Sequence, residues 1–220
     1  MPVNKEAYQE LIKELSEKGI VLVAVSKTKP ASDILALYEM GHRDFGENYV
    51  QELADKHAQL PSEIRWHFIG HLQSNKVKTI APFVHLVHGV DSFKLLKEIN
   101  KQGEKNNRVI DVLLQVHIAQ EETKFGLDEK ELEEILNTNS GKSHELNNIS
   151  VRGLMGMASL TDDMNKVRIE FKYLKSLFDK CASFNIISMG MSSDYKIAIE
   201  EGSNMVRIGS LIFGERVDRQ

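Results

Sequence analysis

The stretch "IVLVAVSKTKPASDILALYEM" (residues 20–40) places an apolar run directly before a helical pattern. Residues 20–25 are rich in β-branched side chains, which favour strands, and the apolar period changes to that of a helix over residues 32–40. The same unit recurs along the rest of the chain. Such alternation predicts a parallel sheet that is covered by helices.

Eight apolar runs and seven intervening helical segments follow this pattern. Strands are expected over residues 20–25, 43–45, 66–69, 86–89, 109–118, 150–155, 186–189 and 205–208. Helices are expected over residues 32–40, 48–59, 74–81, 92–101, 128–137, 163–182 and 194–200, with an extra amphipathic helix over residues 1–15. Eight units fit an α/β fold of the (β/α)8 TIM barrel type, and a doubly wound open sheet is the alternative. Few prolines and no linker indicate one domain, residues 1–220.

Composition excludes several classes of function. The net charge of -4 argues against a nucleic-acid partner, which usually requires a basic face. No apolar run is long enough to span a bilayer, and the N-terminus has no signal-peptide core. Cys181 is the only cysteine, so an internal disulfide is excluded and a half-buried small residue is expected there. A cytoplasmic protein is predicted.

Lys27 follows the first predicted strand directly, and in a barrel the carboxyl ends of the strands carry the chemistry. Its side chain shares the parity of Val21, Val23 and Val25, although both faces of this strand are apolar and parity leaves the inward face open. An amine in an apolar mouth has a lowered pKa and forms a Schiff base with an aldehyde. Lys29 is the rival amine, but it precedes Pro30 and is expected in an extended, outward loop.

Two glycine–serine turns follow the last two predicted strands. "GMSSD" (residues 190–194) and "RIGS" (residues 207–210) offer N–H groups and hydroxyls that bind phosphate, and barrels often bind phosphate after strands seven and eight. The alternative is that both turns only cap helices. An aldehyde together with a phosphate describes pyridoxal 5′-phosphate (PLP), and it also suits a Schiff-base aldolase acting on a sugar phosphate.

Other polar residues have simpler interpretations. Arg207 lies on the eighth predicted strand, where it needs either a ligand or an ion pair with an acid such as Glu47 or Asp194. His67 and His71 are four residues apart, but a strand and a turn separate them, so the geometry of a helical metal site does not apply; His85 and His88 are three apart on a predicted strand, whose alternation would turn them to opposite faces. No metal site is predicted.

Six motifs, in order and at matching spacing, resemble the pyridoxal phosphate homeostasis protein family over essentially the whole chain. They are "AVSKTKP", "FGENYVQE", "WHFIGHLQSNK", "RGLMGM", "GMSSD" and "MVRIGSLIFG". The resemblance implies the fold type III barrel, similar to the N-terminal barrel of alanine racemase. It implies that Lys27 carries PLP as a Schiff base, that Asn48 lies beside the ring, and that Arg207 faces the pyridine nitrogen. The residues that would hold the phosphate are Ser192, Gly209 and Ser210.

An arginine at the ring nitrogen weakens the ring as an electron sink. The sequence also ends at "GERVDRQ", without the second domain that alanine racemase needs. The resemblance therefore implies a monomeric protein that binds PLP and acts in its intracellular homeostasis and delivery to PLP-dependent client enzymes, without strong catalysis. A low-activity PLP-dependent amino acid racemase is the alternative, and the cofactor-free aldolase is a third.

Overall fold

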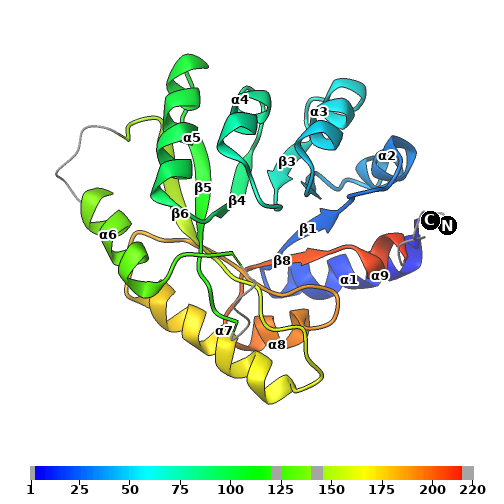
Figure 1. Ribbon diagram of the computed structural model, residues 1–220. Coiled ribbons are helices and arrows are strands. Elements are labelled where there is room, and N and C mark those ends of the chain that lie inside the picture. Colours follow the sequence, from blue (N-terminus) through cyan, green and yellow to red (C-terminus); the bar gives the residue numbers. More distant parts are fainter. Residues whose placement is uncertain (1–2, 120–124, 140–145, 215–220) are drawn as a thin grey trace.

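Eight parallel strands form a closed barrel in the computed structural model, which describes residues 3–119, 125–139 and 146–214. The strands follow one another around the barrel in sequence order, and the helices lie outside them (Figure 1). Closure comes from the first and last strands, where Val21 pairs with Met205 and Val23 with Arg207. This pairing confirms the predicted TIM barrel and excludes the open sheet.

The boundaries of the elements agree closely with the periodicity of the sequence. The strands are β1 (Val21–Val25), β2 (Asp44–Glu47), β3 (Arg65–Phe68), β4 (Leu86–Val90), β5 (Ile110–Gln115), β6 (Ile149–Met155), β7 (Ile186–Ser188) and β8 (Met205–Ile208). The helices are α1 (Lys5–Glu17), α2 (Ala31–Glu39), α3 (Val50–Gln59), the short 3-10 helix η1 (Ser74–Lys76), α4 (Val77–Ile80), α5 (Phe93–Lys105), α6 (Glu129–Asn139), α7 (Met164–Asp179), α8 (Tyr195–Glu200) and α9 (Ser210–Phe213).

Several boundaries differ from the prediction by one to four residues. Helix α3 begins at Val50 and not at residue 48, because the strand β2 continues to Glu47 and the chain turns before the helix. Strand β5 ends at Gln115, and Val116 instead makes an isolated bridge to Leu127. Helix α7 ends before Cys181, which is partly buried. The polar stretch "NTNSGKSHELNNIS" (residues 137–150) also predicts a long surface loop before the sixth strand, and its residues 140–145 lie outside the described part of the chain.

The apolar residues form two separate layers. The larger layer joins the outward side chains of the strands, such as Leu22 and Trp66, to helix residues such as Leu37. The smaller layer fills the barrel interior, and its buried members all lie on strands, namely Val23, Leu86, Leu113, Met155 and Met205. Because Val23 belongs to the inner layer, the odd-numbered residues of β1 face inward. The inward parity of Lys27, which the sequence left open, follows from this.

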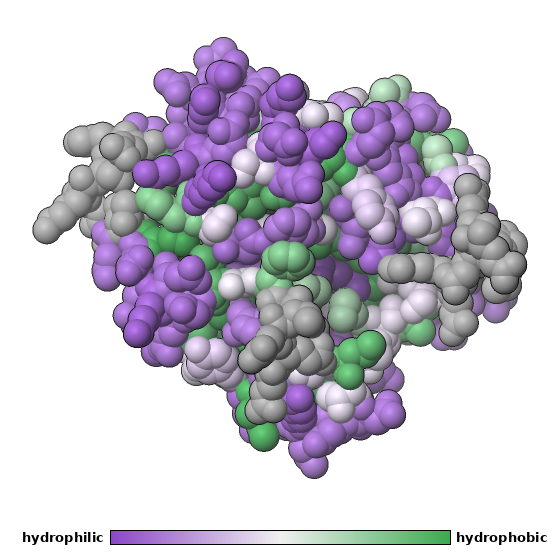
Figure 2. All heavy atoms as spheres, in the orientation of Figure 1, coloured by the Kyte–Doolittle hydropathy of each residue, from purple (hydrophilic) through white to green (hydrophobic). Residues whose placement is uncertain are grey.

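Helix α1 is the predicted extra element, and it lies against α9 and β1 (Figure 1). Asn4 caps it by accepting a hydrogen bond from the Ala7 amide at 3.1 Å, and the Asn4 amide donates to the Ile212 carbonyl of α9 at 2.9 Å. Hydrophilic residues cover most of the visible face over the outer helices (Figure 2). Within the described residues, the helices are too short or too polar to cross a membrane.

Candidate functional site

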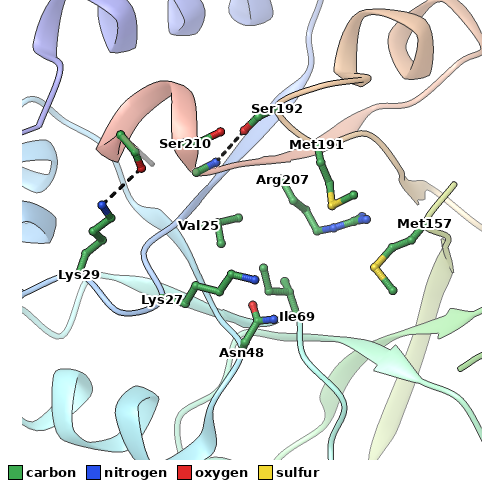
Figure 3. A pocket seen from close by; sticks show the side chains of 12 residues that line it. Val25, Lys27, Lys29, Asn48, Ile69, Met157, Met191, Ser192, Arg207 and Ser210 are labelled. Carbon is green, nitrogen blue, oxygen red and sulfur yellow. Dashed lines mark hydrogen bonds between the residues drawn. The ribbon is translucent and has the colours of Figure 1, made fainter. Parts of the chain in front are cut away.

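A pocket of about 230 Å³ opens among residues at the carboxyl ends of the strands. It contains all six residues that the sequence analysis placed in one site, and Figure 3 shows their side chains around it. Those six are Lys27, Asn48, Ser192, Arg207, Gly209 and Ser210. Apolar side chains complete the wall, namely Val25, Ile69, Met157 and Met191. A ring-shaped ligand with a few polar groups suits such a lining.

Lys27 reaches the pocket because it follows the inward-facing end of β1, and a strained turn comes after it. The side chain continues the inward face of the strand, and in Figure 3 it extends across the pocket toward Asn48. Thr28, the next residue, has a φ of 64°, which is unusual for a β-branched side chain. The Thr28 amide donates to the Glu52 carboxylate at 2.6 Å. Strain of this kind persists only where the surroundings hold it, so the turn after Lys27 is a fixed part of the site.

A buried ionic network lies against the same turn. Lys56 of α3 donates to the Ser26 carbonyl at 2.8 Å and to the carboxylates of Glu47 and Glu52, each at 2.7 Å. The Ser26 hydroxyl donates to Glu47 at 2.6 Å. Burial raises the pKa of Glu47, although Lys56 and Ser26 oppose that shift. This network ties β1, β2 and α3 together directly behind Lys27.

Lys29 has a different role from Lys27. Its amine donates to the carbonyl of Phe213 at 2.7 Å and approaches the carbonyl of Gly214 at 3.4 Å (Figure 3). The sequence prediction of an outward loop is therefore wrong for this side chain, which also lines the pocket. The contact joins the turn after β1 to the end of α9, so Lys29 stabilises one wall of the pocket.

Asn48 occupies the bend between β2 and α3, which explains why the helix starts two residues later than expected. Its Oδ1 atom is buried and has no hydrogen-bond partner among the described residues. Gly70 approaches it so closely that an added Cβ would lie 2.3 Å from the Asn48 carbonyl oxygen. A residue with a side chain cannot take the place of Gly70 without moving Asn48. A buried amide oxygen without a partner is uncommon, and Asn48 is also one of the residues that line the pocket.

The two serine turns meet at the pocket. The Gly209 amide points to the Ser192 hydroxyl at 3.4 Å, and Ser210 is the first residue of α9. Helix α8 begins after Asp194 and α9 after Gly209, and neither helix has a side-chain cap. The N-cap residues Asp194 and Gly209 lie in these turns, but neither Ser192 nor Ser210 caps a helix. Their hydroxyls, together with the first amides of α9, provide donors on one side of the pocket.

Arg207 points into the pocket from β8 and is only 4% exposed. Its Nη1 atom donates to the Ser188 carbonyl at 2.8 Å and the Ser188 hydroxyl at 2.6 Å, and Nη2 donates to the Gly156 carbonyl at 3.1 Å. Burial lowers its pKa to about 10, with a small opposing effect of Asp194. Among the described residues it forms no ion pair with Asp194 or Glu47, so the ion-pair alternative does not hold.

Sequence reasoning missed a hydrogen-bonded cluster inside the barrel. His67 Nδ1 lies 2.9 Å from His88 Nε2, and His67 Nε2 lies 3.0 Å from Asp44 Oδ1. His88 Nδ1 lies 3.1 Å from the Ser188 hydroxyl. The argument from strand alternation was wrong for His85, because β4 begins only at Leu86 and the His85 ring also lies against His67. Barrel closure, which residue spacing does not reveal, brings these side chains together.

Three of these groups could in principle hold a cation. Asp44, His67 and His85 each place one ligand atom within 4.8 Å of the others. Asp44, however, already accepts two hydrogen bonds from Arg65, at 2.7 and 2.5 Å. The guanidinium thus places a positive charge on the carboxylate that a metal would need. The absence of a metal site stays a prediction.

Comparison with known proteins gives consistent matches along nearly the whole chain. The family model for the alanine racemase N-terminal domain matches residues 4–217. The pyridoxal phosphate homeostasis protein of Aquifex aeolicus (strain VF5) is 42% identical over 201 residues, which cover 89% of this chain and 86% of that protein. The protein of the same name from Homo sapiens is 40% identical over 212 residues, covering 89% and 76% respectively.

Solved structures agree. PipY of Synechococcus elongatus PCC7942, solved with PLP bound, has a TM-score of 0.86 and 32% identity, covering 95% of this chain and 99% of that one. Alanine racemase of Clostridium difficile 630 has a TM-score of 0.76 at 16% identity, covering 99% of this chain and 60% of that one, which shows a shared fold. With the domain model and the curated relatives in agreement, the chain belongs to the pyridoxal phosphate homeostasis protein family.

Proposed function

We propose that this protein binds PLP as a Schiff base on Lys27 and serves in PLP homeostasis and delivery without strong catalysis. One observation carries the proposal: an amine after β1, an arginine on β8 and the two serine turns after β7 and β8 line one small pocket. The relatives named as homeostasis proteins and the PLP-bound PipY structure support it.

The lining residues fit the groups that PLP presents. When bound, PLP supplies an aldehyde that condenses with amines, a phosphate, and a ring that withdraws electrons. Lys27 would supply the amine that condenses with the aldehyde, with loss of water. Ser192, Gly209 and Ser210 offer hydroxyl and amide donors to the phosphate. Asn48 lines the same pocket and offers its side-chain amide to a polar group beside the ring.

The charged groups of the pocket argue for binding and against efficient turnover. With a pKa of about 10, Arg207 keeps its proton at neutral pH, donates to the ring nitrogen and leaves that nitrogen unprotonated. Among the described residues, the ionisable side chains that line the pocket are Lys27, Lys29 and Arg207. Racemisation requires an acid or base on each face of the substrate. Lys29 already donates to α9, so the racemase alternative lacks a second base here.

The wider setting of the proposed function follows the same reasoning. We treat residues 1–220 as one cofactor-binding domain that acts as a monomer in the cytoplasm and passes PLP to PLP-dependent enzymes. The net charge of -4 supports a role without nucleic acid. Size-exclusion chromatography with light scattering, repeated with and without PLP, tests the monomer; a dimer in both states would contradict it.

The test of the cofactor assignment begins with visible absorbance after incubation with PLP. Borohydride reduction should then bleach the protein, and mass spectrometry of peptides should locate a pyridoxyl group on Lys27. Lys27→Ala should lose the adduct, whereas Lys29→Ala should retain it on Lys27, because the Lys29 amine is held by the carbonyl of Phe213. An adduct on Lys29 alone would overturn the assignment.

Two further outcomes separate the alternatives. A protein that stays colourless and unmodified would favour the sugar-phosphate aldolase, which borohydride traps only with substrate present. A yellow protein that converts L-alanine to D-alanine steadily would favour the racemase. Both amino acid enantiomers should be followed by chiral chromatography, with the Lys27→Ala variant as the background rate.

A further inference from the structure

A chain of polar side chains crosses the interior of the barrel from the pocket to its opposite end. It begins at Arg207 and continues through Ser188, His88 and His67 to Asp44, with successive distances of 2.6, 3.1, 2.9 and 3.0 Å. Arg65 closes the far end by donating twice to Asp44. Both histidines are at most 1% exposed. Buried polar groups in such numbers among apolar neighbours call for an explanation beyond packing.

When both histidines are neutral, the groups at the two ends of the chain allow only one direction of hydrogen-bond donation along it. Asp44 is ionised, since the hydrogen bonds from Arg65 and His67 lower its pKa although burial alone would raise it. A carboxylate only accepts, so His67 donates to it from Nε2 and must accept at Nδ1 from His88. Burial lowers the pKa of His88 well below its usual range, so its remaining nitrogen accepts from Ser188.

This direction of donation fixes the orientation of the Ser188 hydroxyl, and the hydroxyl in turn fixes the orientation of the Arg207 guanidinium. With its proton directed to His88, the Ser188 oxygen turns a lone pair to Arg207. The guanidinium has five N–H groups, of which two go to Ser188 and one to Gly156. Two N–H groups, on Nε and Nη2, have no acceptor among the described residues. The plane of the guanidinium is thereby fixed with donors left for a ligand.

We propose that His88 and Ser188 are positioning residues that hold Arg207 toward a pyridine-type ring nitrogen, and that the chain ending at Asp44 sets their hydrogen-bond direction. The proposal rests on the proposed function, because it specifies how the pocket recognises the ring of PLP. Neither residue lines the pocket. Their effect reaches the ligand only through Arg207.

Two amide substitutions of His88 interrupt the hydrogen-bonded chain at different contacts. In His88→Asn the amide occupies the place of Nδ1, so its oxygen still accepts from Ser188. In His88→Gln the amide occupies the place of Nε2, so it still donates to His67 but leaves the Ser188 hydroxyl without its acceptor. Both variants remove one buried imidazole, and thermal unfolding should show similar losses of stability. They differ in the contact that the proposal requires.

The readout compares PLP with its carbocyclic analogue, in which a C–H group replaces the ring nitrogen. The wild-type protein should prefer PLP by about tenfold or more, as expected for a hydrogen bond from a charged donor. His88→Gln and Ser188→Ala should lose most of that preference, whereas His88→Asn should retain it. Equal weakening of both ligands in all three variants, or a wild-type protein without preference, would overturn the proposal. Ser188→Ala keeps the test valid where a His88 variant does not fold.

A second measurement needs no cofactor and separates the two proposals. Nitrogen-15 NMR of the cofactor-free protein at pH 8 should show both His67 and His88 protonated on Nε2. Asp44→Asn removes the carboxylate that fixes the tautomer of His67, so the two histidines should no longer be restricted to protonation on Nε2. A proton on Nδ1 of His88 would overturn the inference even where PLP binds. A wild-type protein that shows the expected tautomers but fails to bind PLP would overturn the proposed function and, with it, the role of the chain in ring recognition.

Discussion

Two buried polar networks adjoin the pocket, and they differ in where their charge lies. The network behind Lys27 is ionic: the Lys56 amine contacts two carboxylates and a carbonyl within 2.8 Å. In the chain inside the barrel, the proposed hydrogen-bond direction makes the middle residues neutral, and the charges lie at the two ends, Arg207 and Asp44. The first network joins strands to a helix, whereas the second runs between strands of the barrel.

The difference shows two ways to organise a site. In the ionic network the contacts reach the backbone of residues 26 and 28, so the network fixes the course of the chain around Lys27. In the neutral chain the contacts reach the Arg207 guanidinium, so they fix the orientation of one side chain. Removal of a charge should therefore damage the first network most, and a change of proton position should damage the second.

Lys56→Met should have the largest effect on stability. It leaves Glu47, which is 0% exposed, without its cation, and breaking one side of a buried ion pair costs about 3–5 kcal/mol. Urea unfolding at pH 7 measures the loss. In Glu52→Gln, an amide oxygen can still accept from Lys56 and Thr28, so that control should lose less than about 1 kcal/mol.

A second substitution sharpens the test. Adding Glu47→Gln to Lys56→Met removes the unpaired buried charge, and part of the lost stability should return. Additive losses from the two changes would show that Glu47 and Lys56 do not depend on each other. The ionic description of this network would then be wrong.

Acid should weaken the region at the far end of the neutral chain. Burial lowers the pKa of His42 to about 4, although its hydrogen bond to the Asp44 carbonyl raises it in part. Between pH 6.5 and about 4 the unfolded chain binds a proton that the folded protein does not, so stability falls as the pH falls. The contribution of His42 amounts to about 3 kcal/mol at most over that interval.

The ionic network should respond in the opposite direction. Because burial raises the pKa of Glu47, acid lets the folded protein bind a proton that the unfolded chain still lacks. Urea unfolding between pH 7.5 and 4.5 should therefore give a steeper decline in Glu47→Gln than in the wild type, and a shallower one in His42→Gln. Parallel curves for all three proteins would contradict both assignments.

Much of this organisation was predictable from the sequence. Each strand-and-helix unit has its own periodic pattern of apolar residues, and the residues at a strand end directly follow that strand in the sequence. Lys27 and the two serine turns could therefore be assigned to one end of a barrel. The inward direction of Lys27 was not predictable, because both faces of β1 are apolar. Only the membership of Val23 in the inner layer decides it.

The two networks could not be predicted from the spacing of residues along the sequence. His67 and His88 meet because β3 and β4 are neighbours, and Ser188 reaches them only across the closed barrel. Lys56 lies nine residues from Glu47 and 30 from Ser26, with a helix and a strand end between them. Local periodicity predicts elements, whereas such contacts depend on register, curvature and closure.

The smallest expected effect concerns the turn that the ionic network holds. Thr28 is exposed at a φ of 64°, where a β-branched residue is strained and glycine is not. Glycine also increases the entropy of the unfolded chain, so Thr28→Gly should raise the free energy of unfolding by only about 0.5 kcal/mol. Asn107 is the matched control, since it is exposed at a φ of 51° but asparagine tolerates that conformation. Asn107→Gly should therefore bring no gain in urea unfolding. A loss of stability in Thr28→Gly alone would show that the threonine side chain itself supports the turn, and that the contact from Glu52 is insufficient to hold Lys27 in place.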